Sequence, residues 1–258
     1  MDNMDQVFSL HGLHALVTGG ASGIGEATTK ELARAGAHVW VADINLTAAE
    51  NLAATIRSTG MYAQALSMNV TDEASIQAAL AHLTQLDILV NNAGIGHVGS
   101  VATTATEDFD RLMNINVRSV FLVTRALLPL LLASPAKGTI VNIASVAGLI
   151  GIRQRFAYCT SKGAVVAMTR QLAVEYPKEL RVNAICPGTV ETPFVEGYLD
   201  KYHAHEKEKV REELRARQPI GRLGTPQDVA SMVRYLVSQE ASFVTGSLFT
   251  IDGGWTAA

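Results

Sequence analysis

Short, continuous apolar runs alternate with longer segments of helical periodicity along the whole chain. Five apolar runs read as strands: Ala15–Thr18, Val39–Ala42, Ile88–Val90, Ile140–Ile143 and Val182–Ile185. Continuous rather than alternating apolar character is typical of strands buried on both faces, as in a parallel sheet covered by helices. The stretches between them predict helices: Gly25–Ala35, Ala48–Ser58, Glu73–Thr84, Glu107–Leu132 and Ala164–Tyr176.

This repeated strand–helix order predicts an α/β fold, a doubly wound Rossmann sheet with right-handed crossovers. Thr250–Gly254 predicts a last strand and a tight turn. Because no linker rich in Pro, Gly or Ser divides the chain, residues 1–258 are expected to form a single domain. The charged segment Glu196–Arg217 follows a strand end. It predicts either a substrate lid, within residues 190–222, or a solvated surface helix.

Composition narrows the class of protein. The formal net charge of −3, with mixed signs, argues against nucleic acid or anionic membrane as a partner. Two cysteines, Cys159 and Cys186, are too few for a disulfide framework or a cysteine metal site, and no metal is expected. Met1–Leu10 shows no leader pattern, and the apolar stretch Val117–Leu132 is interrupted by charges and a proline. A soluble, cytoplasmic protein is the expectation.

A glycine-rich turn, Thr18–Gly25, follows the first predicted strand and opens the first predicted helix. Its TGxxxGxG pattern would let the backbone approach a pyrophosphate at the helix N-terminus. Asp43 ends the second predicted strand, where a carboxylate accepts hydrogen bonds from ribose hydroxyls and repels a 2′-phosphate. Since no Lys or Arg lies between Arg34 and Arg57, the sequence favours NAD over NADP.

Two further turns end predicted strands at the same edge of the sheet. The Asn69 amide, followed by Val70, would be placed to hydrogen-bond an adenine edge. After Asn91, the small residues Ala93 and Gly94 would let the chain pass tightly behind a cofactor. Ordinary turn chemistry explains both segments equally well.

Tyr158 and Lys162 are four residues apart on a predicted helix, so they project from one face. A tyrosine of pKa near 10 is a poor base at neutral pH, and a neighbouring ammonium is expected to lower that pKa toward the useful range. Ser145 stands at the end of the fifth predicted strand, where its hydroxyl would face a ligand crevice. Asn116, inside an apolar helical segment, must be paired. We expect a water relay to Lys162, the alternative being a helix-kinking structural asparagine.

In order and spacing, these motifs together resemble the short-chain dehydrogenase/reductase family over nearly the whole chain. The resemblance implies a seven-stranded parallel sheet, a homotetramer or dimer joined through the long helices, and a catalytic tetrad of Asn116, Ser145, Tyr158 and Lys162. It also implies these NAD contacts: Gly19, Ser22, Gly23, Ile24, Gly25, Asp43, Asn69, Val70, Asn91, Ala93, Gly94, Tyr158, Lys162, Pro187, Gly188, Val190 and Thr192. One departure is Asn69, where the family more often has aspartate.

Arg155 lies three residues before Tyr158, where a guanidinium would match a substrate carboxylate with two hydrogen bonds. Ser145 and Tyr158 would hold the reacting oxygen, and Arg217, followed by Arg222, would add a second clamp. This pattern is similar to that of cytosolic 3-hydroxybutyrate dehydrogenases and of bacterial dehydrogenases of 2-keto-3-deoxy sugar acids such as L-fuconate and L-rhamnonate derivatives.

Other interpretations stay open for the arginines and for the protein. Arginines usually form surface or subunit salt bridges, which is the preferred interpretation for Arg153, Arg217 and Arg222. His97 is expected to be a packed loop histidine, and His203 with His205 to face solvent. The substrate would otherwise be a neutral polyol, steroid or cyclic ketone. A catalytically silent NAD-binding regulator is the alternative from another class.

Overall fold

The computed structural model describes residues 7–258, so most of the Met1–Leu10 segment lies outside the described residues. A single seven-stranded parallel sheet runs through it in the order β3-β2-β1-β4-β5-β6-β7. The strands are β1 His14–Thr18, β2 His38–Asp43, β3 Ala63–Ser67, β4 Ile88–Asn91, β5 Gly138–Ile143, β6 Leu180–Pro187 and β7 Leu248–Ile251. The seven parallel strands predicted for the sheet are confirmed.

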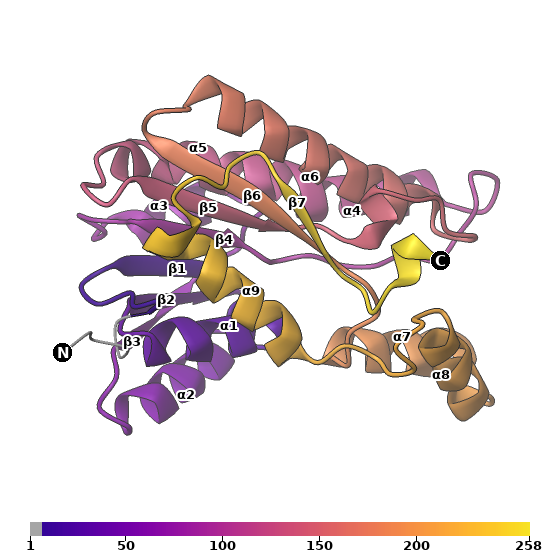
Figure 1. The fold of residues 1–258 in the computed structure, drawn as a ribbon. Helices are drawn as coiled ribbons and strands as arrows, with labels where there is room; N and C mark the ends of the chain where they lie inside the picture. The colour runs from indigo at the N-terminus through magenta and orange to yellow at the C-terminus, as the bar shows by residue number, and fades with distance from the viewer. Residues whose placement is uncertain (1–6) are drawn as a thin grey trace.

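Helices cover both faces of this sheet (Figure 1). The principal helices are α1 Gly23–Arg34, α2 Leu46–Arg57, α3 Glu73–Leu80, α4 Thr106–Met113, α5 Ser119–Leu132, α6 Phe156–Glu175, α7 Pro193–His203, α8 Lys207–Ala216 and α9 Pro226–Val237. Helices α1, α2 and α9 lie on one face, and α3 to α6 lie on the other. Helices α7 and α8 extend beyond the sheet as a separate pair.

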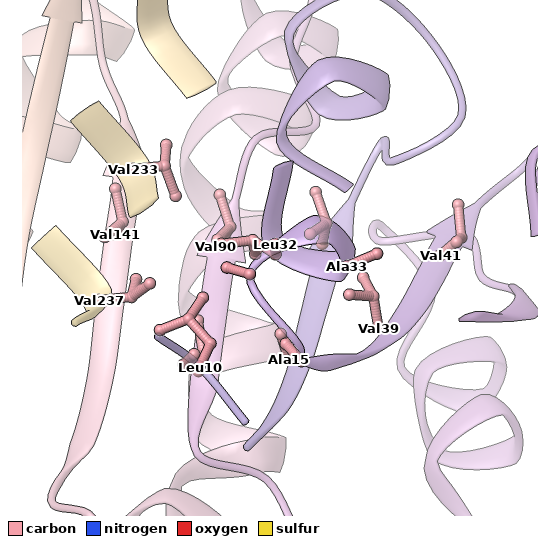
Figure 2. Close-up of a cluster of buried hydrophobic side chains, with 14 of the residues drawn as sticks. Leu10, Ala15, Leu32, Ala33, Val39, Val41, Val90, Val141, Val233 and Val237 are labelled. Carbon is pink, nitrogen blue, oxygen red and sulfur yellow. The ribbon is translucent and has the colours of Figure 1, made fainter. Parts of the chain in front are cut away.

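Strand β1 shows why the chain needs both layers. Ala15 and Val17 belong to the core under α1 and α9, whereas Leu16 between them belongs to the core under α3 and α5. Figure 2 shows the first of these cores, where Leu32 of α1 and Val233 of α9 meet the strands. Since successive side chains on a strand point to opposite faces, a strand with both faces covered must be apolar throughout.

Several predicted boundaries were wrong, most of all the start of the predicted Ala164–Tyr176 helix, because α6 begins at Phe156. Strand β3 ends at Ser67, so the Asn69–Val70 segment follows it instead of ending it. Helix α3 ends at Leu80 instead of Thr84, and β7 begins at Leu248 instead of Thr250. Helix ends and strand ends depend on tertiary packing, which local periodicity does not encode.

The predicted Glu107–Leu132 helix is interrupted in its middle. A π-helical turn, Asn114–Arg118, joins α4 to α5. Within residues 7–258, the continuous helical run Thr106–Leu132 is long and apolar enough to cross a membrane by length and composition alone. The run agrees with the predicted Glu107–Leu132 helix to within one residue. Leu122, Leu127 and Leu131 of this run are buried in the core on the sheet, as in the core helix of a globular domain.

The order of the strands reverses between β1 and β4, which places a crevice at their carboxyl ends. The chain leaves β6 into α7 and α8 and returns through a short parallel bridge between Val190 and Gly224. Glu191 N–H donates to Gly224 O and Gly224 N–H donates to Thr189 O, at 2.8 and 2.9 Å. This bridge closes the base of the segment that contains α7 and α8, beside the crevice.

Candidate active site

A cavity of about 530 Å³ opens at the carboxyl edge of the sheet. Its walls come from the β1–α1 turn, the loop after β4, the end of β5, the first turns of α6 and the α7–α8 segment. Many of the predicted site residues line it: Gly19, Ser22, Gly23, Ile24, Ala93, Gly94, Ser145, Arg155, Tyr158, Lys162, Pro187, Gly188, Val190, Thr192 and Arg217. Residues that are far apart in the sequence thus meet around one space.

The glycine turn presents its backbone to this cavity. Helix α1 begins at Gly23, and the Ser22 side chain makes no capping hydrogen bond, so the first N–H groups of the helix are open toward the cavity. Gly19 and Gly23 have positive φ values of 59° and 54°, which suit glycine. A cradle of this kind fits the phosphates of a dinucleotide at a helix N-terminus.

Gly25 has a different role from the one predicted. It is buried and does not line the cavity. A Cβ at this position would lie 2.0 Å from the Gly19 carbonyl oxygen and 2.6 Å from the Asn92 amide nitrogen. Gly25 therefore allows α1 to pack against the turn itself, whereas Gly19 and Gly23 are the glycines that face the cavity.

Asn92, which the sequence reasoning did not select, fixes this turn. Its amide nitrogen donates to the carbonyl oxygens of Thr18 and Gly19, both at 3.0 Å, and its own N–H donates to Thr18 Oγ1. Asn92 also lines the cavity. The asparagine pair in the sequence after β4 was the available signal, but only the fold shows which member faces the turn.

Its neighbour Asn91 points away from the cavity. The Asn91 amide nitrogen donates to Thr124 Oγ1 at 3.2 Å and to Asn142 Oδ1 at 2.9 Å, and Asn142 in turn donates to Thr169. This buried network joins β4, β5, α5 and α6 behind the site. The structure thus assigns the Asn91 side chain to packing and not to the cavity wall.

The three residues predicted for the adenosine end lie beyond the lining of the cavity. At the end of β2, the Asp43 carboxylate accepts hydrogen bonds from the N–H groups of Ala21 at 3.1 Å and Asn45 at 2.9 Å. This contact places the carboxylate directly beside the glycine turn. Asn69 Oδ1 accepts from Thr71 N–H and Oγ1, which leaves its amide nitrogen as the end that is free of these bonds, and Val70 packs against the core.

Asn116 is buried, with 1% of its surface exposed, in the π-helical turn. Its Oδ1 accepts from Ile95 N–H at 2.8 Å, and its amide nitrogen donates to Ile95 O at 2.9 Å and to Ser161 Oγ at 3.1 Å. Protein groups therefore satisfy the side chain without the predicted water relay to Lys162. The π-turn agrees with the alternative prediction of a structural asparagine, and Asn116 is placed to position the loop after β4.

Ser145, Tyr158 and Lys162 meet at the base of the cavity. Ser145 caps a short helical turn, accepting from Ala147 N–H at 3.1 Å, and its hydroxyl donates to Pro187 O at 3.5 Å. Lys162 Nζ lies 5.9 Å from the centre of the Tyr158 ring and donates to Ile143 O at 2.9 Å. The i, i+4 spacing on α6 thus places the phenol and the ammonium side by side, as predicted.

The predicted direction of the Tyr158 pKa was wrong for the protein without cofactor. Burial raises the pKa of Tyr158, and the Ser145 hydrogen bond and the Arg155 charge offset this only in part. Burial also lowers the pKa of Lys162 to about 8. Removing water from both groups disfavours their charged forms, and here that effect exceeds the mutual attraction the spacing suggested.

Arg155 is fixed beside Tyr158 by both its backbone and its side chain. A parallel bridge joins Arg155 to Gly99, and Arg155 Nη1 donates weakly to His97 O at 3.4 Å. The guanidinium lies 4.6 Å from the centre of the Tyr198 ring of α7. Within residues 7–258, no carboxylate lies within salt-bridge distance of Arg155, so its charge faces the cavity without an acidic partner.

The other arginines and histidines considered as substrate contacts differ in whether they line the cavity. Arg222 forms a bidentate pair with Asp228, at 2.7 and 3.2 Å, which is the surface salt bridge expected of it. Arg217 and His97 line the cavity, whereas Arg153 does not. His203 was wrongly expected only to face solvent, since its Nε2 pairs with Tyr198 Oη at 2.8 Å.

Fold and site together define a nicotinamide-dependent oxidoreductase of one large family. The family model described as enoyl-(acyl carrier protein) reductase matches residues 19–256, and the chain belongs to the short-chain dehydrogenase/reductase family. Members act on CH–OH groups and the corresponding ketones, and this protein is an alcohol/ketone oxidoreductase.

Its relatives act on chemically diverse substrates. The 2-(S)-hydroxypropyl-CoM dehydrogenase 3 of Xanthobacter autotrophicus is 43% identical over 93% of this chain and 95% of its own. The cyclopentanol dehydrogenase of a Comamonas species is 42% identical over 94% and 96%. The 2-keto-3-deoxy-L-fuconate dehydrogenase of Xanthomonas campestris is 39% identical over 96% and 81%.

Among solved structures, the 3-ketoacyl-(acyl-carrier-protein) reductase of Brucella melitensis complexed with NADH superimposes with a TM-score of 0.85 at 36% identity. The match covers 96% of this chain and all of that one. The likeness extends over the whole sheet and its helices, so the fold of a nicotinamide-binding oxidoreductase is shown.

Proposed function

We propose that the protein is an NAD-dependent dehydrogenase that interconverts a secondary alcohol and a ketone on a substrate that carries a carboxylate. The observation that carries this proposal is the juxtaposition of Arg155 with Tyr158 on one cavity wall, where the guanidinium has no acidic partner among residues 7–258. A buried or half-buried cation without a partner favours an anionic ligand, and a guanidinium matches the two oxygens of a carboxylate.

The Tyr158 hydroxyl is the proton carrier in this proposal. During alcohol oxidation the deprotonated Tyr158 oxygen takes the proton of the substrate hydroxyl, and during ketone reduction the Tyr158 hydroxyl gives that proton to the ketone oxygen. The Ser145 hydroxyl holds the substrate oxygen, because Ser145 lines the same cavity as Tyr158 and stands at the end of β5 beside it. Lys162 supplies a positive charge beside the phenol and holds the nicotinamide ribose. Bound NAD supplies the hydride acceptor.

Asp43 supports NAD as the cofactor over NADP. Its carboxylate is tied to the glycine turn through Ala21 N–H, at the place where the adenosine ribose lies in this fold. A 2′-phosphate there would meet a negative charge. No Lys or Arg follows before Arg57, whose guanidinium donates to Ala63 O on the helix side of β3.

A carboxylate-bearing substrate such as a 2-keto-3-deoxy sugar acid or a 3-hydroxy acid fits the charge of the cavity. Its lining contains Arg155 and Lys162 near the reacting position and, among residues 7–258, no aspartate or glutamate. A relative named for 2-keto-3-deoxy-L-fuconate supports the acid, whereas one named for cyclopentanol supports a neutral substrate. The unpaired guanidinium favours the acid.

Matched substrates and matched variants test the proposal. With NAD, we expect oxidation of 3-hydroxybutyrate to respond to Arg155→Met with a KM increase of about 10- to 100-fold, since a charged hydrogen-bond pair is lost. Oxidation of 2-butanol, which lacks the carboxylate, should change less than threefold. Arg153→Met, which removes an exposed arginine two residues earlier, is the control. Equal losses on the acid and the alcohol would refute the carboxylate assignment.

We also propose that the protein is a homotetramer in the cytoplasm. The outer faces of α5 and α6 expose large apolar side chains, with Phe121 half exposed and Val174 75% exposed. Such side chains support subunit contacts through these helices. Cys159 and Cys186 are free thiols, which fits a reducing compartment. Light scattering at micromolar concentration would test the assembly directly.

A further inference from the structure

The cations of the α7–α8 segment are of two kinds. Four that do not line the cavity are ion-paired: Lys207 with Asp200, Lys209 with Glu206, Arg211 with Glu196 and Glu208, and Arg215 with Glu208 and Glu212. Two others, Lys201 and Arg217, line the cavity. Within residues 7–258 neither has a carboxylate within salt-bridge distance.

Both of these cations rest on aromatic rings. Lys201 Nζ lies 5.1 Å from the centre of the Tyr202 ring, and the Arg217 guanidinium lies 5.9 Å from the centre of the Trp255 indole. A ring face stabilises a cation without neutralising it. The arrangement repeats that of Arg155 on Tyr198, whose ring lies 5.8 Å from the Tyr202 ring on the same helix. Each cation is thus held in place with its charge still available.

Lys201 and Arg217 are exposed residues on helix faces that border the cavity. Lys201 lies three and four residues after Tyr198 and Gly197, which both line the cavity, so the three share one face of α7. Arg217 lies three residues after Leu214, which also lines it and packs α8 against α7. The apolar contact between the helices therefore holds α7 and α8 together beside the cavity that Lys201 and Arg217 line.

We propose that Lys201 and Arg217 form a second anion subsite, so that the substrate is a dianion. One anionic group binds Arg155 beside the reacting carbon, and the second binds the lid pair, Lys201 and Arg217. Arg155, Lys162, Lys201 and Arg217 line one cavity without a carboxylate partner among residues 7–258, and a ligand with two negative charges relieves more of their mutual repulsion than a monoanion does. This inference rests on the proposed function, because it takes the Arg155 site as the first anion site.

Binding to the NADH complex tests the second subsite without turnover. Calorimetry compares glutarate and adipate, which carry two carboxylates, with butyrate, which carries one. In the unmodified protein we expect at least one dicarboxylate to bind tenfold or more tightly than butyrate. Lys201→Met and Arg217→Met should each remove that preference and leave butyrate affinity within a factor of two. Lys207→Met and Arg215→Met are the controls, because those cations are ion-paired and do not line the cavity.

Several results would overturn the second subsite. One is a dicarboxylate preference that survives Lys201→Met, and another is an equal loss in the Lys207→Met control. A matching fall in NADH affinity would assign the two cations to the cofactor phosphates instead. The Arg155 test remains separate: a Lys201→Met variant that keeps the dicarboxylate preference, beside an Arg155→Met variant that loses acid selectivity, refutes only the second subsite.

Discussion

The two ends of the cavity are built in different ways. The cofactor end is a backbone structure, in which the glycine turn, the start of α1 and the Asp43 carboxylate are joined by hydrogen bonds to main-chain groups. The other end, where α6 meets the α7–α8 segment, is a side-chain structure, in which Arg155 and Arg217 lie on aromatic rings from other segments. A dinucleotide is invariant, so a rigid backbone cradle suits it, whereas a variable substrate is recognised by exchangeable side chains.

This difference implies different sensitivities to mutation. At the cofactor end, any side chain that enters the turn displaces backbone and abolishes binding. At the end near α7 and α8, a substitution removes one side-chain contact and changes substrate affinity by the energy of that contact. The following tests are ordered from the largest expected effect to the smallest.

Gly25→Ala should be the most damaging of these changes. Its Cβ would lie 2.0 Å from the Gly19 carbonyl oxygen, a distance that no rotamer change relieves. We expect NADH affinity, measured by fluorescence titration, to fall at least about 100-fold, since the turn must shift as a unit. Gly151→Ala is the control, because a Cβ there meets nothing within 4 Å. Normal NADH binding by Gly25→Ala would show that the turn tolerates displacement.

Asp43→Ser should change which cofactor is used. Removing the carboxylate removes the repulsion of a 2′-phosphate and a hydrogen-bond acceptor for the ribose. The kcat/KM ratio of NAD to NADP should fall about 10- to 100-fold. Asp72→Ser, which alters a helix cap away from the cavity, serves as the comparison. An unchanged ratio would place cofactor selection elsewhere.

Lys162→Met should reveal the cost of a buried ammonium. Burial lowers the pKa of Lys162 from 10.5 to about 8, so the unfolded chain binds more protons between these pH values and stability rises with pH across that window. The variant lacks this rise and should be more stable below pH 8, by on the order of 1–3 kcal/mol. Urea unfolding at pH 7 and pH 10 measures the difference. Identical pH profiles for the two proteins would show that Lys162 titrates normally.

The cofactor end of the cavity could be predicted from the sequence better than the end near α7 and α8. The strand runs and the position of Ser145 before Tyr158 and Lys162 predict the sheet and the convergence at its edge, because parallel topology fixes where strand ends meet. The same local logic could not show that Gly25 serves packing and Asn91 a buried network. Both depend on which neighbours the fold supplies.

The α7–α8 segment was the least predictable region from the sequence. Charge alone left a lid and a solvated helix equally open for Glu196–Arg217, because both have the same composition. The fold shows that Leu199 and Leu214 share one apolar cluster between α7 and α8 and that Lys201 and Arg217 border the cavity. The prediction that the Tyr158 pKa is lowered was wrong for a related reason. The sequence spacing shows that Tyr158 is near Lys162, but it does not show that burial removes water from the phenol.

The identity of the proton carrier is the claim on which the account depends, and Tyr158→Phe tests it most directly. The measurement is NADH formation from a panel of secondary alcohols and hydroxy acids at saturating NAD, with NADH affinity determined in parallel and Tyr176→Phe as the control. The account predicts a loss of about 10³-fold or more in kcat with NADH affinity within a factor of three. A kcat within threefold of the unmodified enzyme, at equal NADH affinity, would contradict it.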